Sequence, residues 1–271
     1  MTLMQMQRPV GELLRDWREQ RRLSQLQLAV LADVSTRHLS FIETGRSQPS
    51  REMVQLLAEH LDLPLRERNQ LLLAAGFAPV YSQNPLDAAE MSPIRAALRQ
   101  LLSGHEPYPA VVVDRDWNLV DANDSLAVFT GLAAPELLEP PVNVMRLALH
   151  PKGVAPHIVN LTEWRTHLLT RLRRRVALTG DPRLTELYDE LTVYPCDLSA
   201  TGGQHPATDI VVPLRLRQED GELRFFCTVA TFGTPTDITV AELAIESFFP
   251  ADDHTAQTLI RMRSGAAGAR R

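Results

Sequence analysis

The sequence has little of what a secreted or membrane protein needs. Its 271 residues include two cysteines, Cys196 and Cys227, so a disulfide framework is not expected and a reducing cytoplasm fits. No apolar run approaches the ~20 residues of a membrane span. The opening segment MTLMQMQRPVGELLRDWREQ becomes charged too early for a secretory signal peptide. We therefore expect a cytoplasmic protein without a membrane partner.

Motifs of common enzyme classes and metal sites are also missing. The chain has no GxSxG elbow, no Walker loop and no dinucleotide fingerprint. Three of its eight histidines, His150, His157 and His167, lie in one region but without tight ligand spacing. Zinc or haem ligation is therefore a weaker alternative to surface or capping roles. We expect no catalysis, no metal and no cofactor.

The chain also lacks the excess positive charge that many DNA-binding proteins carry, since its formal net charge is −5. The charge is distributed unevenly. Residues 1–80 contain 10 basic and 9 acidic residues, a net of +1, whereas residues 81–271 contain 18 and 24, a net of −6. All ten basic residues of the first part are arginine, which suits bidentate contacts to phosphate and guanine. DNA binding would therefore depend on a few arginines on one face.

The length of the chain favours two domains, and the first shows a clear helical pattern. Residues 10–76 contain five short amphipathic segments separated by capping and turn residues. Ser24 and Gln27 can form a capping box at the second segment, and Ser35 can cap the third. Gly45 suits the left-handed position after the third. The pattern predicts a compact all-α domain of five helices.

The third segment carries the strongest functional signal. Leu39 and Ile42 point into the predicted core, so the opposite face is left to polar, basic and aromatic side chains. In a helix-turn-helix, the exposed N-terminal end of this helix enters the major groove of DNA. The alternatives are a helix-turn-helix that binds protein and one that has lost DNA binding; for Phe41 the alternative is a place in the core.

The pattern SQ…LA…VS…LS.IE.G…PS…..LA..L.LP resembles the Cro/C1-type helix-turn-helix domain of phage repressors and the xenobiotic-response-element family. The resemblance implies that one glutamine contacts a phosphate and that the third helix reads bases and meets the DNA backbone. The implied contact residues are Gln25, Ser35, Thr36, Arg37, His38, Ser40, Phe41, Thr44 and Arg46. One departure is Asp33, which stands where the family often has glycine; aspartate tolerates a positive φ better than most residues.

Two other groups of arginines admit two interpretations. Arg15, Arg18, Arg21 and Arg22 could contact phosphates, but a solvated helix face is the better expectation for at least two of them. The run RLRRR at 171–175 could be a second nucleic-acid patch, although helices commonly show such a charged face.

The remainder of the chain predicts an α+β domain. A linker and connecting helix are expected over 79–104, the domain itself over 105–262 and a flexible tail over 263–271. Short early strands meet at a hairpin near Asp116–Asn118, several helices follow, with Asn123 or Asp124 capping one of them, and three strands come last, the third within 237–250. Antiparallel pairing of the early and late strands would give one sheet.

This second part resembles the ligand-binding domain of MmyB-type bacterial regulators, a fold similar to PAS sensors. The resemblance rests on YPAVVVDRDWNLVDAN, NVMRLALHP, TGDPRL and FGTPTDITVAELAIESFFPADDHT, whereas 192–208 lacks the usual tryptophan-bearing pattern. It implies an apolar pocket. Residues that could line the pocket, or simply fill the core, are Trp117, Phe129, Met145, Leu149, Trp164, Phe226 and Phe232.

Together these patterns predict a sequence-specific transcription regulator that binds a double-stranded DNA operator as a homodimer. A small apolar ligand, such as a fatty acid, would modulate operator binding through the second domain. Two alternatives remain. The second domain could be an enzyme tethered to DNA by the helix-turn-helix, or a protein-interaction domain that needs no ligand.

Overall fold

The computed structural model describes residues 8–196, 211–218 and 221–269. The chain divides into two compact units. The first unit contains Met1–Pro85 and Gly233–Ala241, and the second contains Leu86–Phe232 and Glu242–Arg271. The chain therefore passes between the units three times, because a short segment late in the sequence returns to the first unit. None of the described helices is long and apolar enough to cross a membrane.

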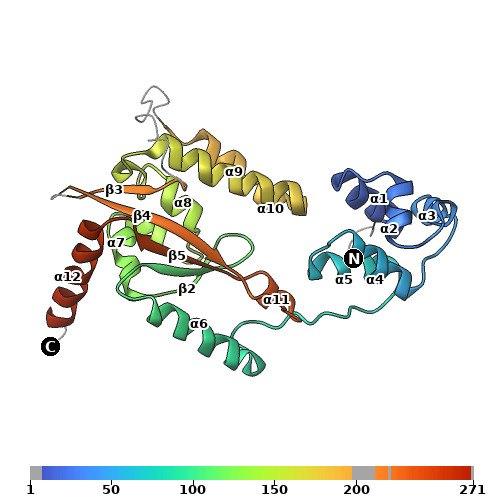
Figure 1. Cartoon of the computed structure of the whole chain (residues 1–271), viewed down its shortest axis with the longest axis horizontal. Helices are drawn as coiled ribbons and strands as arrows, with labels where there is room; N and C mark the ends of the chain where they lie inside the picture. Colours follow the sequence, from blue (N-terminus) through green and yellow to red (C-terminus); the bar gives the residue numbers. More distant parts are fainter. Residues whose placement is uncertain (1–7, 197–210, 219–220, 270–271) are drawn as a thin grey trace, which may run out of the picture. The chain divides into compact units, whose positions relative to one another are not determined.

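The first unit confirms the predicted five-helix domain (Figure 1). Its helices are α1 (Val10–Gln20), α2 (Gln25–Leu31), α3 (Thr36–Glu43), α4 (Arg51–His60) and α5 (Leu65–Ala74). The helix starts follow from local chemistry. Ser24 and Gln27 form the predicted capping box, and the Ser35 hydroxyl accepts a hydrogen bond from a backbone N–H of α3. Asp33 has a φ of 52° and Gly45 a φ of 72°, so both turns adopt the expected left-handed conformation.

One tight contact fixes the packing of α1 against α3. A Cβ atom at Gly11 would lie 2.3 Å from the carbonyl oxygen of Ile42, so only glycine allows this approach. Leu14, Leu39 and Ile42 are almost completely buried in the same core. The recognition helix predicted from the sequence is therefore held by close backbone packing as well as by its apolar face.

The segment expected to be a free linker is fastened to the first unit up to residue 85. The side-chain amide of Asn69 binds the backbone of Tyr81 through a donated hydrogen bond of 2.7 Å and an accepted one of 3.1 Å. Further along, one carboxylate oxygen of Asp237 accepts hydrogen bonds from Ser82 and Asn84 at 2.9–3.1 Å. These contacts arise because the buried polar groups of this loop need partners.

Asp237 also corrects the prediction that the last strand begins within DITV. Its other carboxylate oxygen accepts the backbone N–H of Thr239 at 2.8 Å, so it caps the short helix α11 (Ile238–Ala241). Strand structure begins only after this helix. The β-branched residues predicted a strand, but capping by Asp237 starts a helical turn instead.

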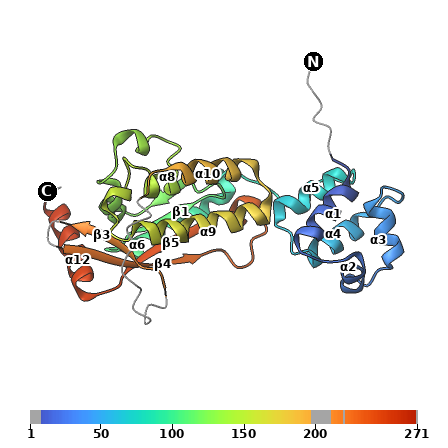
Figure 2. The ribbon, with the colours of Figure 1, turned by 90° about the horizontal axis from the view of Figure 1, so that it is seen from above.

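The second unit is built on a five-stranded antiparallel sheet, which confirms the predicted α+β fold (Figures 1 and 2). The sheet order is β2-β1-β5-β4-β3. Its strands are β1 (Ala110–Val113), β2 (Leu119–Ala122), β3 (Leu214–Gln218), β4 (Gly221–Ala230) and β5 (Ala244–Pro250). The predicted turn between β1 and β2 is present, with Trp117 at a φ of 65°. Pairing of an early strand with the last one places β5 at the centre of the sheet.

Helices cover both faces of this sheet (Figures 1 and 2). Val111 and Val113 pack into the larger core, while Ala110 and Val112 pack into a smaller core beneath α6. All four residues of β1 are consequently buried. The helices of this unit are α6 (Ser92–Gly104), α7 (Ala127–Thr130), α8 (Val144–Leu149), α9 (Leu161–Thr179), α10 (Pro182–Val193) and α12 (Asp253–Ala269), with short 3₁₀ turns at Ala89–Met91, Asp124–Leu126, Pro135–Leu138 and Ala155–His157.

α6, in the position of the expected connecting helix, packs on the sheet through Leu98 and Leu102. Two other local expectations for this unit require correction. Asn123 does not cap a helix with its side chain; it accepts the N–H of Ala110 at 3.0 Å and donates to a carbonyl of α6. α12 extends to Ala269 through the expected tail, where alanine's high helix propensity favours continuation.

Candidate functional site

The outer surface of α3 presents a basic and aromatic group of side chains. Arg37 and His38 are exposed, and Phe41 is half-buried. The guanidinium of Arg37 lies 5.3 Å from the centre of the Phe41 ring, and that of Arg46 lies 6.0 Å from it. Both distances suit cation–π contact, so the Phe41 ring lies next to two guanidinium groups on this surface. The predicted outward position of Phe41 agrees with this arrangement.

Behind this surface, a buried charge network joins the first three helices. Arg18 donates to both carboxylate oxygens of Glu43 at 2.7 and 2.9 Å, and the Gln25 amide donates to the second oxygen at 2.8 Å. The hydrogen bond that Arg18 donates to Glu43 raises the pKa of Arg18. Glu43 is the last residue of α3, so the network fixes that helix against α1 and α2. Arg18 therefore has an internal role, contrary to the phosphate contact considered for it.

Other sequence-predicted residues shape the ends of α3. The Ser35 hydroxyl accepts the N–H of His38 at 3.1 Å, and the Thr44 hydroxyl donates to the Ser40 carbonyl at 2.7 Å. Thr36 and Ser40 are half-buried. Among the α1 arginines, Arg21 donates to carbonyls of the α4–α5 turn, so it too is used within the domain.

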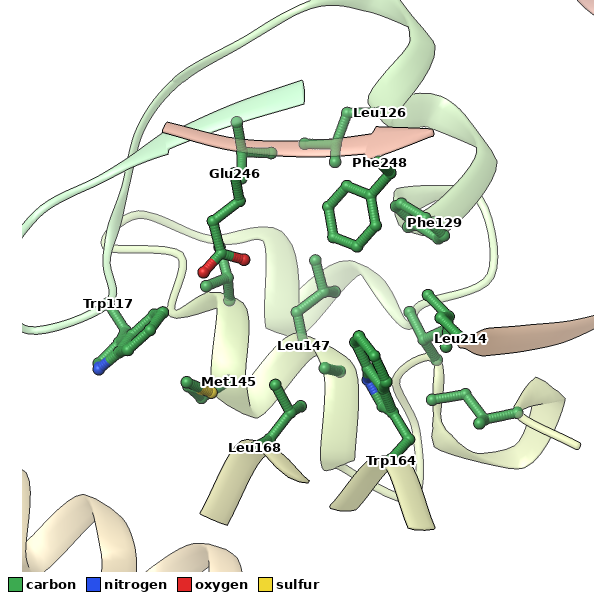
Figure 3. A pocket seen from close by; sticks show the side chains of 15 residues that line it. Trp117, Leu126, Phe129, Met145, Leu147, Trp164, Leu168, Leu214, Glu246 and Phe248 are labelled. Carbon is green, nitrogen blue, oxygen red and sulfur yellow. The ribbon is translucent and has the colours of Figure 1, made fainter. Parts of the chain in front are cut away.

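The second unit contains an apolar cavity between the sheet and helices α8 and α9 (Figure 3). Its volume is about 70 Å³. The lining residues are Val111, Trp117, Leu126, Phe129, Val144, Met145, Leu147, Ala148, Val154, Ile158, Trp164, Leu168, Leu214, Glu246 and Phe248.

The structure brings together four of the seven residues proposed for the pocket, namely Trp117, Phe129, Met145 and Trp164. The other three lie elsewhere. Leu149 is buried in the same core without lining the cavity, Phe226 stacks on Phe249 at 5.1 Å, and Phe232 packs against the smaller core. Strand register explains Phe226, because adjacent residues of a strand point to opposite faces.

Glu246 and Phe248 line the cavity but were not predicted from the sequence. Both lie on β5, on the face that also carries Cys227 of the paired strand. A charged residue within the apolar run AIESFFP, at the same strand parity as Phe248, was the signal that could have identified Glu246.

Glu246 forms the polar part of the cavity wall. It is 6% exposed, and its carboxylate points into the cavity from β5 (Figure 3). Arg171 of α9 donates to one carboxylate oxygen at 2.7 Å, and its guanidinium lies 4.7 Å from the centre of the Trp117 ring. His167 stacks on Trp164, with 5.4 Å between the ring centres. Burial, together with the positive charge of Arg171, lowers the pKa of His167. The cavity therefore combines an apolar interior with one buried carboxylate, which is paired with Arg171.

A second charge cluster lies next to the Trp117 turn. Arg115 pairs with Asp181 and approaches Glu242 at 3.4 Å. Burial raises the pKa of Asp116, and burial lowers the pKa of Arg175. Two arginines of the RLRRR run, at 171 and 175, are thus turned toward the interior of the unit, which leaves the exposed Arg173 and Arg174 as its outward charges.

The remaining candidate residues, the cysteines and histidines, do not form a site in the described part of the chain. Cys196 and Cys227 are free, and burial raises the pKa of the Cys227 thiol to about 12. His150 accepts the backbone N–H of Lys152 at 3.0 Å. In the described ranges, no three His, Cys, Asp or Glu side chains gather as a metal site would require. The departure noted at 192–208 falls almost entirely outside the described residues.

Known protein families match both parts of the chain. A helix-turn-helix family model matches residues 14–68, and the model of the MmyB-like transcription regulator ligand binding domain matches residues 94–262. Together they define a DNA-binding transcription regulator with a ligand-binding domain. Because the second match covers more than half of the chain, the protein belongs to the MmyB-like transcription regulators. No match was found among curated proteins.

Among solved structures, one described as an RNA-binding light-oxygen-voltage receptor is similar at 15% sequence identity. The similarity covers 94% of this chain and 66% of that chain, with a TM-score of 0.23. A TM-score this low does not establish a shared fold.

Proposed function

We propose that the protein is a homodimeric regulator that reads a palindromic operator with α3 and whose DNA affinity is set by a small molecule in the second unit. The observation that carries the DNA-binding part is the pair of guanidinium groups on the Phe41 ring. They place positive charge and a flat apolar surface side by side, which suits guanine, phosphate and the thymine methyl group.

Within this proposal, Thr36, Arg37 and Phe41 contact base edges. His38, Thr44 and Arg46 meet the backbone or neighbouring bases. Gln25 contacts a phosphate with the amide hydrogen that Glu43 does not hold, since its amide nitrogen carries two donors. Ser35 and Ser40 border the same face. Because the first part of the sequence has a net charge of only +1, these few contacts supply the specificity.

The apolar cavity supports the ligand part of the proposal. A domain that only binds protein does not need such a cavity, whereas a sensor does. Its walls are aliphatic and aromatic, so the bound molecule is mainly apolar. The apolar walls suit the hydrocarbon chain of a fatty acid. Whether its carboxylate can also bind depends on the polar residue of the cavity wall.

The path of the chain supports a coupling between ligand and DNA. β4 and β5 belong to the second unit, but the segment between them, Gly233–Ala241, belongs to the first. Glu246 and Phe248 line the cavity on β5, five and seven residues after that segment ends. A ligand that shifts β5 would therefore act on a segment bound to the first unit through Asp237. Such a ligand changes DNA affinity only if it binds the two states differently.

The test is selection of bound sequences from random DNA with the full-length protein, followed by measurement of Kd for the selected operator. We expect a palindrome with half-sites about one helical turn apart. Arg37→Ala is expected to cost about 1–3 kcal/mol and to relax one base preference. Arg15→Ala is the matched control, because Arg15 pairs with Glu19 on α1. Unchanged affinity and selectivity in Arg37→Ala would show that α3 does not read the bases.

A further inference from the structure

The wall of the cavity carries a charged residue, and its chemistry bears on which ligand can bind. Among the described residues that line the cavity, Glu246 is the only charged one. Its side chain is 8% exposed and points inward from β5 (Figure 3). A carboxylate buried in this way requires hydrogen-bond donors or a positive partner.

Arg171 satisfies only part of this requirement. One guanidinium N–H donates to Oε1 of Glu246 at 2.7 Å. Within the described part of the chain, no group donates a hydrogen bond to Oε2. Since each carboxylate oxygen can accept about two hydrogen bonds, Glu246 keeps capacity for a donor on the ligand.

Arg171 itself is placed outside the cavity. It is not one of the lining residues, its guanidinium lies against the Trp117 ring, and its side chain is 22% exposed. An anionic group entering the cavity would therefore meet the carboxylate of Glu246 before any positive charge. Like charges at short range in a buried apolar site repel strongly.

We propose that the cavity binds a lipophilic molecule whose polar end is a hydrogen-bond donor, an amine or a hydroxyl group, and that it rejects the carboxylate of a fatty acid. Glu246 accepts the donor and determines specificity, and Arg171 is a positioning residue that holds the carboxylate aimed inward. This assignment rests on the proposed ligand-binding function, and it replaces the fatty acid suggested by the sequence.

The test compares three probes of equal chain length, decylamine, 1-decanol and decanoic acid, each below its micelle concentration. Binding to the full-length protein at neutral pH is measured by calorimetry and thermal shift. We expect the amine to bind at least about tenfold more tightly than the acid, the difference that one charge-assisted hydrogen bond supplies, with the alcohol in between. In Glu246→Gln the amine-to-acid ratio should fall to about one, because the amide accepts and donates without charge.

Two further variants separate the possible results. Glu190→Gln is the matched control, since Glu190 pairs with Arg146 and does not line the cavity. Ala148→Phe fills the cavity and should abolish binding of every probe. If the acid binds wild-type protein as tightly as the amine, the donor assignment is overturned and Arg171 is the recognition group. If no probe binds, or if Ala148→Phe leaves binding unchanged, ligand binding by the cavity fails as well.

Discussion

Each unit of the protein contains a buried arginine–glutamate pair, and the two pairs differ in how completely they are satisfied. In the first unit, Glu43 receives two hydrogen bonds from Arg18 and one from Gln25. In the second unit, Glu246 receives one hydrogen bond from the described residues, donated by Arg171. The first network carries three hydrogen bonds on an almost completely buried carboxylate and locks a helix. The incomplete one faces a cavity and can accept a ligand, so the same two residue types serve structure in one place and recognition in the other.

The largest expected effect comes from breaking the complete pair. Glu43→Ala leaves Arg18 buried without its partner, which should destabilise the first unit by about 3–5 kcal/mol. Glu246→Ala should cost less, below about 2 kcal/mol, because Arg171 is partly exposed and can turn to water. Urea denaturation of both variants measures the costs, and hydrogen exchange localises them to α1–α3 or to the sheet.

Equal losses of stability in Glu43→Ala and Glu246→Ala would contradict this difference between the two buried pairs. The double variant Arg18→Met/Glu43→Leu provides the control. Replacing both partners with apolar residues removes the buried charge and should recover much of the stability lost in Glu43→Ala.

The next effect concerns the segment that connects the two units. Asp237→Ala removes the acceptor of Ser82 and Asn84 and the cap of α11, at an expected cost of about 1–3 kcal/mol. DNA and ligand should still bind separately, but the ligand should no longer change the Kd for DNA. Asp87→Ala, at an exposed position, is the control. Intact coupling in Asp237→Ala would exclude this segment as the connection.

The two units also differ in how far their sites could be predicted from the sequence. The α3 surface lies on one helix, so the spacing of Leu39 and Ile42 was sufficient to place Arg37 and Phe41 outward. The cavity draws residues from strands and helices that are distant in sequence. Four of its residues were predicted from their aromatic or apolar side chains. Whether Phe226 or an adjacent residue of the strand faces the cavity depends on strand register, and register depends on long-range pairing.

Side-chain partners were the least predictable feature. Arg18 and Arg21 look like surface residues in an amphipathic helix, yet both form hydrogen bonds inside the first unit. Glu246 looks like a solvent-facing residue of a strand. Its burial follows from the central place of β5 in the sheet, which local pattern does not reveal. Asn123 likewise has a capping sequence but serves as a bridge between α6 and β1.

A smaller effect is expected from a partly exposed ion pair in the second unit. The hydrogen bond from Arg146 lowers the pKa of Glu190 from its ordinary 4.5. The stabilisation is therefore present above this ordinary value and is lost as the pH falls through the lowered pKa. Glu190→Gln should cost less than about 1 kcal/mol at neutral pH, since both side chains are solvent-screened. Urea denaturation should show the difference from wild type vanishing in acid; a difference that grows in acid would contradict the assignment.

The smallest effect is expected at the turn before α3. Asp33→Gly should leave DNA affinity unchanged and stability equal or higher by up to about 1 kcal/mol, because relief of left-handed strain is offset by glycine's greater entropy loss. Asp62→Gly is a matched comparison, since Asp62 has a φ of 48° and follows α4. A loss of DNA binding confined to Asp33→Gly would reveal a direct role for the Asp33 carboxylate.

Control of DNA binding by the second unit is tested most directly by the Kd of the full-length protein for its selected operator, measured with and without a saturating amount of the tightest-binding of the three alkyl probes. If ligand binding in the second unit controls DNA affinity, this Kd should change by at least about fivefold, the lower end of typical coupling between two sites. The change should disappear in Ala148→Phe, in which the cavity is filled. An unchanged Kd, with the probe shown by calorimetry to occupy the cavity, would contradict the claim that the second unit controls DNA binding.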